Sequence, residues 1–501
     1  MDKDNELTEY GHKERNIKIN QSKNFEQKQN TDLEGDGLAG QKPERDEGAK
    51  NSVRAAENKM GVVPVGKLLF TMSFPAMISM MIQALYNIVD SIFVAMISEK
   101  ALAAVTLVFP VQMLLASVGV GTGVGISSLI SRRLGERRFK EANEAASHGF
   151  LIAAFNWILF AVFGLFFSAS FVKLFSGDIE IVGMAVAYCG IVTVGSLFGF
   201  TQLSVERILQ ASGNMLFPMI FGIVGAVVNT ALDPVLIFGL FGAPRMGVTG
   251  AALATVIGQA LAMSVGLIML FCFKHDVRVR LRGFRPRGRI IRDIYAVGAP
   301  SIAMMAMNSF AISGMNAILI RFSTAAVAVL GAYFRLQSLI FMPVFGLNQG
   351  ALPIMGYNYG AKNRKRLLKT FRISVTTAVV IMAVGIVIFQ IFPAQILGLF
   401  SASPEMMSVG TDALRIISLC FIPAGFIIVS STLFQGLGHG MLSLLVTLLR
   451  QILLVLPLAW LLSTFFGLHY VWYAYPLAEV FTLALTILFV KRVYDKEIRR
   501  L

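Results

Sequence analysis

The sequence contains few of the residues that usually build enzyme centres or disulfide frameworks. Only 3 of its 501 residues are cysteine, and 15% are charged. Cys189, Cys272 and Cys420 lie in apolar segments and show neither metal-ligand spacing nor a disulfide pattern. The chain also lacks a glycine-rich phosphate loop with lysine, a His–Glu zinc motif and a paired-aspartate metal motif. These absences argue against ATP-driven chemistry, against a metal or other cofactor and against a membrane-embedded enzyme.

Charge is scarce outside the first 60 residues, which hold 13 acids and 11 bases. The other 441 residues contain 16 acids and 33 bases. The N-terminal segment is polar and has no apolar periodicity, so it cannot bury enough surface to offset its chain entropy. We therefore expect residues 1–61 to form a disordered cytoplasmic tail. No apolar core follows the basic start, so we expect no signal peptide.

Long apolar runs fill the rest of the chain, which is 55% hydrophobic overall. A helix needs about 20 apolar residues to cross a bilayer. We predict twelve spans, at about 68–96, 102–130, 146–170, 182–206, 216–240, 248–273, 294–320, 326–354, 371–397, 407–434, 441–465 and 471–490. The predicted fold is an all-α integral membrane protein that interacts with a lipid bilayer.

An internal repeat relates the two halves of this membrane region at a constant offset of 225 residues. Pro75 recurs as Pro300, and Gln112 recurs as Gln337. Further matches are Gly121 with Gly346, Gly125 with Gly350, Gly135 with Gly360 and Gly213 with Gly438. Six spans per copy give both halves the same orientation, as in transporters built from parallel repeats. We predict two six-helix bundles, residues 62–273 and 293–501, joined by a basic cytoplasmic linker, residues 274–292.

Basic residues gather in alternate loops. The loops after the second, sixth and eighth spans, together with the C-terminus, hold 24 lysines and arginines, whereas the opposite loops hold four. The positive-inside rule then places both termini in the cytoplasm and the protein in the cell membrane. Since these bases flank membrane spans, they do not indicate nucleic-acid binding.

A polar stripe follows the first span. Ser79, Gln83, Asn87 and Asp90 are spaced by four, four and three residues, which places them on one helical face. Ionisable residues inside a membrane are costly and are functional candidates by default. A stripe that ends in a carboxylate favours the wall of a wet cavity over a contact with a neighbouring helix. We expect Met80, Gln83, Tyr86 and Asn87 to line a substrate cavity.

The fifth span carries a second polar group. Asn229 and Asp233 lie one turn apart, and Pro234 leaves a carbonyl of the preceding turn without its backbone donor. Together with Asp90 they could bind Na⁺, or hold a carboxyl group whose proton affinity is raised by burial. A kinked helix whose polar groups satisfy one another is the structural alternative.

Three further charged residues, Arg335, Arg450 and Glu479, fall well inside spans of the second half. The sequence does not decide whether they serve structure or function.

Several motifs resemble the multidrug and toxic compound extrusion (MATE) antiporters. They are FPAMISMMIQALYNIVDSIFVAM in the first span, NTALDPVLIFG and GVTGAALATVIGQ in the fifth and sixth, and FRLQSLIFMPVFGLNQGALPIMGYNYGAKN in the eighth. The last is similar to the bacterial drug-efflux subgroup, and the resemblance covers residues 62–495. It implies a monomeric secondary transporter that exports cationic or amphipathic small molecules in exchange for H⁺ or Na⁺.

The resemblance also assigns residues. The family's first-helix acid falls on Asp90, its fifth-helix pair on Asn229 and Asp233, and a sixth-helix threonine on Thr255 or, alternatively, Thr249. One branch uses acids of the seventh and tenth helices; here the seventh span has no acid and Ala424 stands near the tenth-helix position. The resemblance therefore favours ion coupling in the N-terminal half.

Other readings remain open at this level. A flippase for lipid-linked saccharides shares the architecture, but the N-terminal spans offer almost no bases for a pyrophosphate. A major-facilitator exporter also has twelve spans, yet its Asp-Arg and Gly-Arg-Arg loop signature is absent, and SRRLGERRFKEAN stands in its place.

Overall fold

The computed structural model describes residues 58–280, 284–398 and 403–501. Within these ranges the chain is helical and forms no strand. Eleven helices are long and apolar enough to cross a membrane, and the bent pair α15 (Pro404–Ser418) and α16 (Phe421–Leu437) supplies a twelfth span. The predicted all-α membrane fold is confirmed. Residues 1–57 of the expected tail lie outside the described residues, after which the short helix α3 (Lys59–Val62) begins.

The N-terminal half consists of six spans. They are α4 (Val65–Ala95), α5 (Glu99–Gly135), α6 (Phe139–Val162) with η1 (Phe163–Phe167) and α7 (Ser168–Lys173), α8 (Ile179–Ala211), α9 (Leu216–Phe238) and α10 (Val248–Cys272). The short η2 (Leu240–Gly242) joins the last two.

The C-terminal half repeats this order with more interruptions. Its elements are α11 (Gly288–Leu319), α12 (Thr324–Gly360), α13 (Arg364–Ile391), α14 (Pro393–Gly398), α15, α16, α17 (Gly440–Leu448), η3 (Leu449–Val455), α18 (Leu456–Phe466), α19 (Leu468–Val471), α20 (Ala474–Lys496) and η4 (Ile498–Arg500). The tenth span, expected as one helix, is broken between α15 and α16 by a bend of 49°.

Corresponding helices of the two halves begin at corresponding caps. The hydroxyl of Ser98 accepts a hydrogen bond from the Ala101 amide at the start of α5, and Ser323, 225 residues later, caps α12 in the same way. Side-chain oxygens satisfy backbone N–H groups that the first helical turn leaves free. Gly213 and Gly438 adopt φ values of 91° and 95° at corresponding helix ends, where glycine avoids the cost of a side chain. The repeat therefore sets helix boundaries as well as helix number.

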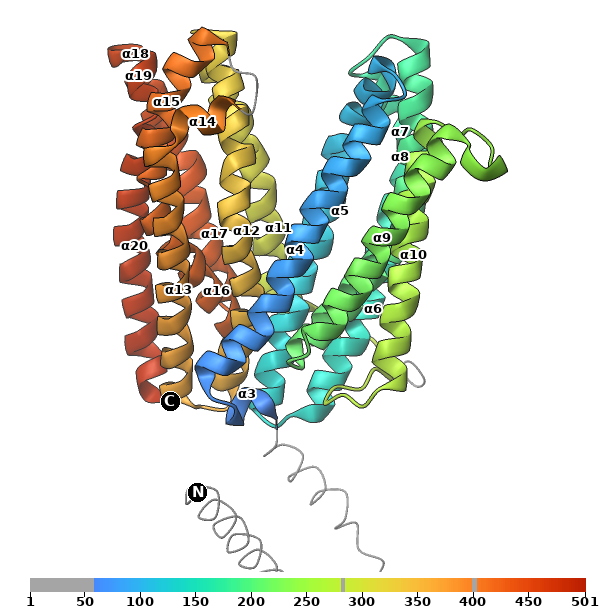
Figure 1. The fold of residues 1–501 in the computed structure, drawn as a ribbon. Coiled ribbons are helices and arrows are strands. Elements are labelled where there is room, and N and C mark those ends of the chain that lie inside the picture. Colours follow the sequence, from blue (N-terminus) through green and yellow to red (C-terminus); the bar gives the residue numbers. More distant parts are fainter. Residues whose placement is uncertain (1–57, 281–283, 399–402) are drawn as a thin grey trace, which may run out of the picture. The chain divides into compact units, whose positions relative to one another are not determined.

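The two halves meet closely at the end of the bundle where the C-terminus lies, and their ribbons diverge toward the other end (Figure 1). At the contact, α5 packs on α11, α12 packs on α4, and α5 and α12 pack on each other. Six glycines lie at these crossings in three pairs related by the offset of 225, namely Gly121 with Gly346, Gly125 with Gly350 and Gly135 with Gly360. A Cβ atom at any of them would lie within 3.0 Å of the opposite half.

The opposing atoms obey the same symmetry. A Cβ on Gly135 would overlap the carbonyl oxygen of Tyr357, and one on Gly360 would overlap that of Arg132, the residue 225 positions before Tyr357. Small residues let membrane helices approach at backbone distance, where packing and polar contacts replace the missing hydrophobic drive. At both of these symmetry-related positions, the backbones of the two halves are therefore in direct contact.

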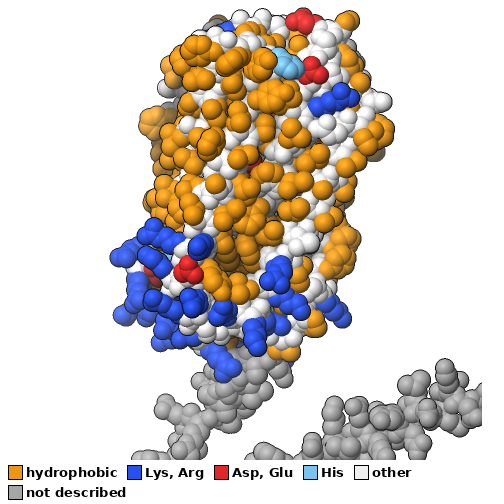
Figure 2. Space-filling view, turned by 90° about the vertical axis from the view of Figure 1, so that its left-hand side faces the viewer, with side chains coloured by type: hydrophobic (Ala, Val, Ile, Leu, Met, Phe, Trp, Pro, Cys, Tyr) orange, Lys and Arg blue, Asp and Glu red, His pale blue; other side chains and the backbone are white. Residues whose placement is uncertain are grey.

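The surface shown in Figure 2 separates charge from apolar side chains. Hydrophobic side chains cover the middle of this face of the C-terminal half, and lysines and arginines gather at its lower end. This distribution is that of a protein embedded in lipid with one strongly basic rim. The contact between the halves lies at this basic end.

The linker between α10 and α11 docks on α6. His148 is fully buried; its Nε2 accepts a hydrogen bond from the Arg287 amide at 2.8 Å, and its Nδ1 donates to the Glu144 carbonyl at 2.7 Å. Asn143 accepts from the Arg278 amide at 2.7 Å. The start of α11 is thus held against the N-terminal half.

The glycine contact makes a direct prediction. Gly135→Ala should destabilise the fold by about 1–3 kcal/mol, because the added methyl overlaps backbone that cannot rotate away. Gly222→Ala is the matched control, since no atom lies within 4 Å of its Cβ position in α9. Thermal unfolding in detergent should show a lower melting temperature for the first variant and an equal or higher one for the second. Equal melting temperatures for Gly135→Ala and the wild type would contradict the backbone contact.

Candidate functional site

Three helices of the N-terminal half hold the predicted ion-binding residues. α9 packs against both α4 and α10. α4 runs along the inner edge of this half, beside the region where the ribbons of the halves diverge (Figure 1). Asp90 projects from α4, Asn229 and Asp233 from α9, and Thr255 from α10. Residues up to 165 positions apart in sequence are thereby assembled at one three-helix junction.

The structure brings these four side chains into one cluster. Asp233 is fully buried and Asn229 is 4% exposed. The Asn229 amide Nδ2 donates to the Thr255 hydroxyl at 3.3 Å, and that hydroxyl donates to the Ala251 carbonyl at 3.1 Å. Asp90 lies close enough to Asp233 for their charges to interact.

Thr249, the other threonine compatible with the resemblance, does not join the cluster. Its hydroxyl donates to the Met246 carbonyl at 2.6 Å, where it closes the turn before α10. Thr255 is the threonine that faces Asn229.

The acceptor atoms of the cluster are left without donors. Oδ1 of Asp90, Oδ1 of Asn229 and both carboxyl oxygens of Asp233 are buried and accept no hydrogen bond from the protein. A buried carboxylate without a partner is costly because it has lost its hydration. Protonation or a bound cation would remove that cost. The cluster therefore has the chemistry of a site for a small cation, rather than that of a kink whose polar groups satisfy each other.

No larger metal site accompanies this cluster. Across residues 58–280, 284–398 and 403–501, no three His, Cys, Asp or Glu side chains converge in a way that could hold a metal ion. The cluster offers two carboxylates and one amide oxygen, a set suited to a proton or a monovalent cation rather than to a tightly held transition metal.

The predicted cavity residues lie on α4 below Asp90. Gln83 and Asn87 are exposed, whereas Met80 and Tyr86 are half-buried. Tyr86 shares a hydrogen bond with Gln83. Exposed amides in the middle of a membrane helix are disfavoured against lipid and favour a water-filled space. This face of α4 is thus a candidate substrate wall.

Sequence reasoning missed a polar contact behind the site. The amide Nε2 of Gln112 in α5 donates to the hydroxyl of Tyr188 in α8 at 2.9 Å, and Tyr188 is 2% exposed. The charges of Asp90 and Asp233 both reach this hydroxyl. In the sequence, Gln112 is distinguished only by its place in the repeat. Tyr188 is a single polar residue in an apolar span and forms no periodic pattern that would indicate a site.

The charges of the second half separate into two groups. Arg450 and Glu479 form an ion pair between η3 and α20, with Nη1 and Oε1 at 3.3 Å. Arg335 lies exposed on α12 and belongs to no such pair in the described residues. The offset of 225 relates Asp90, Asn229 and Asp233 to the apolar residues Met315, Leu454 and Leu458, so the ion pair of the C-terminal half stands at different positions.

Comparison with known proteins adds three findings. The family model described as MatE matches residues 75–235 and again 300–461, once in each half. A FAD transporter of Shewanella oneidensis is 26% identical over 418 residues, covering 83% of this chain and 92% of that protein. The multidrug export protein MepA of Staphylococcus haemolyticus is 25% identical over 415 residues, covering 82% and 90%.

A solved structure described as the outward-facing conformation of a multidrug resistance MATE family transporter superposes on this chain with a TM-score of 0.83. It is 26% identical, and the match covers 89% of this chain and 99% of that one.

The cluster geometry predicts a role for Thr255 that Thr249 does not share. Thr255→Val removes the acceptor of the Asn229 amide and leaves a buried donor unpaired, at a cost of about 1–3 kcal/mol. We expect ion-gradient-driven transport by the purified protein in lipid vesicles to need roughly 10-fold more coupling ion for half-maximal rate. Thr255→Ser should restore the wild-type value, and Thr249→Val should not change it. A Thr249→Val defect as large as that of Thr255→Val would contradict this assignment.

Proposed function

Because the chain belongs to the MatE family, whose model matches both of its halves, we propose that it exports cationic or amphipathic small molecules and couples their exit to entry of H⁺ or Na⁺ at Asp90, Asn229 and Asp233. The chain is a multi-pass membrane transporter of the MATE type, a family with drug-exporting members. Since members of this family move molecules rather than transform them, we infer no enzymatic activity and no cofactor.

The observation that carries this proposal is the set of buried, unpaired acceptor oxygens on Asp90, Asn229 and Asp233. An empty site of this kind has a high free energy, so a cation that enters it stabilises the conformation that contains it. To drive transport, that cation must bind the two conformations unequally. The junction of α4, α9 and α10 supplies such a contrast, because a movement of α4 relative to α9 changes the spacing between Asp90 and Asp233.

H⁺ is the coupling ion that the carboxyl pair favours. One proton shared between Asp90 and Asp233 would remove the repulsion between them and supply the missing donor without any further ligand. Na⁺ is the second candidate, favoured by the unpaired Oδ1 of Asn229, which a proton on a carboxyl group leaves unsatisfied. In both cases the ion is a transported substrate and not a resident cofactor.

The substrate class follows from the wall that α4 presents. Gln83, Asn87 and Asp90 make this face polar with a single negative charge, and Met80 and Tyr86 add polarisable and aromatic surface. Such a surface attracts cations with apolar bodies. A lipid-linked pyrophosphate would require several bases here, which the face does not offer.

We place both termini and the basic rim in the cytoplasm of a cell-membrane protein, following the positive-inside rule. With that orientation the halves are in contact on the cytoplasmic side and apart on the outer side, so the arrangement is outward-facing (Figure 1). One chain supplies both walls of the substrate path, and we propose that it works as a monomer.

Charge-removing variants test the coupling residues. Asp90→Asn and Asp233→Asn should each reduce gradient-driven efflux of a fluorescent cationic dye from reconstituted vesicles to the level of protein-free vesicles. Asp412→Asn is the matched control, because this acid is half exposed beside His469 in the other half. Full gradient-driven efflux by Asp90→Asn, at wild-type amounts in the membrane, would refute the proposed coupling site.

Separate gradients identify the ion. We expect a pH gradient imposed without Na⁺ to drive dye transport, and a Na⁺ gradient at equal pH on both sides to drive little. The reverse pattern would establish Na⁺ as the coupling ion at the same residues. If neither gradient drives dye transport, coupling to H⁺ or Na⁺ is refuted.

A further inference from the structure

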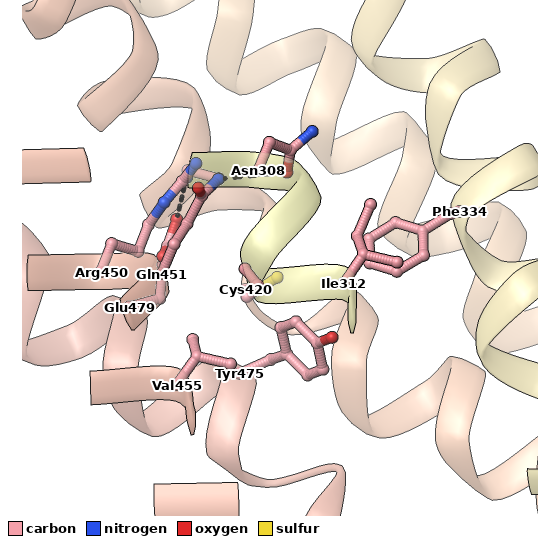
Figure 3. A pocket seen from close by; sticks show the side chains of 11 residues that line it. Asn308, Ile312, Phe334, Cys420, Arg450, Gln451, Val455, Tyr475 and Glu479 are labelled. Carbon is pink, nitrogen blue, oxygen red and sulfur yellow. Dashed lines mark hydrogen bonds and ion pairs between the residues drawn. The ribbon is translucent and has the colours of Figure 1, made fainter. Parts of the chain in front are cut away.

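The C-terminal half contains a small cavity that the proposed ion coupling does not use, with mostly apolar walls and a few polar side chains. Its volume is about 70 Å³, and its walls include Asn308 of α11, Phe334 of α12, Arg450 and Gln451 of η3, and Tyr475 and Glu479 of α20. Figure 3 shows the ends of Arg450 and Gln451 next to Asn308, with the Tyr475 ring below them.

This cavity occupies the position that the ion cluster occupies in the other half. The offset of 225 relates Asn308 to Gln83 and Ile312, which also lines the cavity, to Asn87. The same offset relates α11, η3 and α20 to α4, α9 and α10, the three helices of the ion cluster. Duplication has therefore produced two structurally equivalent three-helix junctions, whose side chains have since diverged.

Its charges are not required by the scaffold. Arg450 corresponds to Gly225 and Glu479 to Ala254, and the N-terminal half folds with these small residues at the equivalent crossings. A buried ion pair in a membrane costs desolvation that its own attraction barely offsets, and apolar replacements are often as stable. The pair therefore indicates a use beyond stability.

A π-helical segment places two consecutive polar residues in the wall of this cavity. Arg450 and Gln451 lie in η3, a π-helical segment between α17 and α18. In an α-helix neighbouring side chains point about 100° apart. Here both line the cavity. π-Helical turns are rare and frequently occur at functional sites.

The hydrogen bonds in the cavity are incomplete. The Nε2 of Gln451 donates to Oδ1 of Asn308 at 3.3 Å, whereas its Oε1 is buried and has no partner. The guanidinium of Arg450 gives one hydrogen bond to Glu479, also at 3.3 Å, which is long for a charged pair. The other N–H groups of Arg450 and of the Gln451 amide can therefore donate to a ligand, whereas Oε1 of Gln451 can accept only from a ligand N–H or O–H group.

The accessible charge of the cavity is positive. The side chain of Glu479 is 5% exposed and lies behind its partner, whereas that of Arg450 is 22% exposed. A ligand that enters meets the guanidinium first. With Glu479 alongside, the net charge of the pair is zero, which suits a monoanion better than a dianionic phosphate. A planar carboxylate matches the fork of an arginine.

We propose that this cavity binds the carboxylate of an aromatic ligand. Arg450 donates to the carboxylate, the amide N–H groups of Gln451 and Asn308 donate to its remaining lone pairs, and Phe334 and Tyr475 contact the ring. In a zwitterion, the ammonium group donates to Oε1 of Gln451. The site lies outside the ion cluster and gives the transporter a place for aromatic anions or zwitterions in addition to cations. Binding here does not depend on Asp90 or Asp233.

Matched ligands test the proposal on the full-length protein in lipid nanodiscs. The probes are benzoate, the neutral benzamide and the cationic benzylammonium, whose single ring suits a small cavity, with affinity measured by equilibrium dialysis. A charge-assisted contact predicts that the carboxylate binds at least about 10-fold more tightly than the amide. No preference for the carboxylate in the wild-type protein would overturn the proposal.

Two variants separate recognition from structure. Arg450→Leu combined with Glu479→Leu removes both charges without leaving one buried alone, and it should abolish the preference. Glu479→Gln removes the competitor for Arg450 and should bind the carboxylate more tightly than the wild type does, which a purely structural role does not predict. Weaker carboxylate binding by Glu479→Gln, or a preserved preference in the double variant, would refute the assignment.

Two controls keep this test separate from the ion site. Arg335→Leu makes the same change at an exposed arginine of α12 that does not line the cavity, and it should retain the preference. A loss equal to that of the double variant would mean general attraction of anions and would overturn the site. Asp90→Asn should bind benzoate as the wild type does, whatever its effect on dye efflux.

Discussion

The structure depends on the close contact between its two halves at the basic end. Glycines at matching positions let backbone meet backbone across the pseudo-two-fold axis, so that Gly135 faces the Tyr357 carbonyl as Gly360 faces that of Arg132. Membrane helices gain little from excluding lipid and must gain from contact. A seam of small residues at one end holds the halves together there and leaves the other end free to diverge. Alternating access requires a contact of this kind that can be made and broken.

The symmetric scaffold carries different side chains at two equivalent sites, the ion cluster of the N-terminal half and the cavity of the C-terminal half. In the N-terminal half the carboxyl groups of Asp90 and Asp233 lie close enough for their charges to interact, and their buried oxygens lack hydrogen-bond donors, which suits a cation. In the C-terminal half Arg450 stands in front of Glu479, so the cavity presents a positive charge. Gene duplication conserves helix packing because packing errors are costly throughout the fold, whereas a few cavity side chains can change at little cost.

Buried polar atoms without hydrogen-bond partners occur both in the ion cluster and in the C-terminal cavity. Oδ1 of Asn229 and Oε1 of Gln451 are buried without donors, although most buried polar groups in the described residues have partners. Native proteins rarely tolerate such atoms unless a ligand, a proton or a conformational change satisfies them. The bend between α15 and α16 and the π-helical η3 both lie in the C-terminal half, which contains the cavity. In the C-terminal half, unpaired polar atoms and interrupted helices thus occur together, whereas the ion cluster lies on the continuous helices α4 and α9.

The sequence by itself determined the twelve spans, the offset of 225 and the candidate residues Asp90, Asn229 and Asp233, because hydropathy and helical spacing are local and because charge inside a membrane is rare. It did not distinguish Thr255 from Thr249, since both lie on one helix and only the approach of α9 selects Thr255. It also left Arg450, Glu479 and Arg335 undecided. Tertiary structure alone shows that Arg450 pairs with Glu479 and that Arg335 is exposed, since ion pairs, the Gln112–Tyr188 contact and the C-terminal cavity arise only when helices distant in sequence meet.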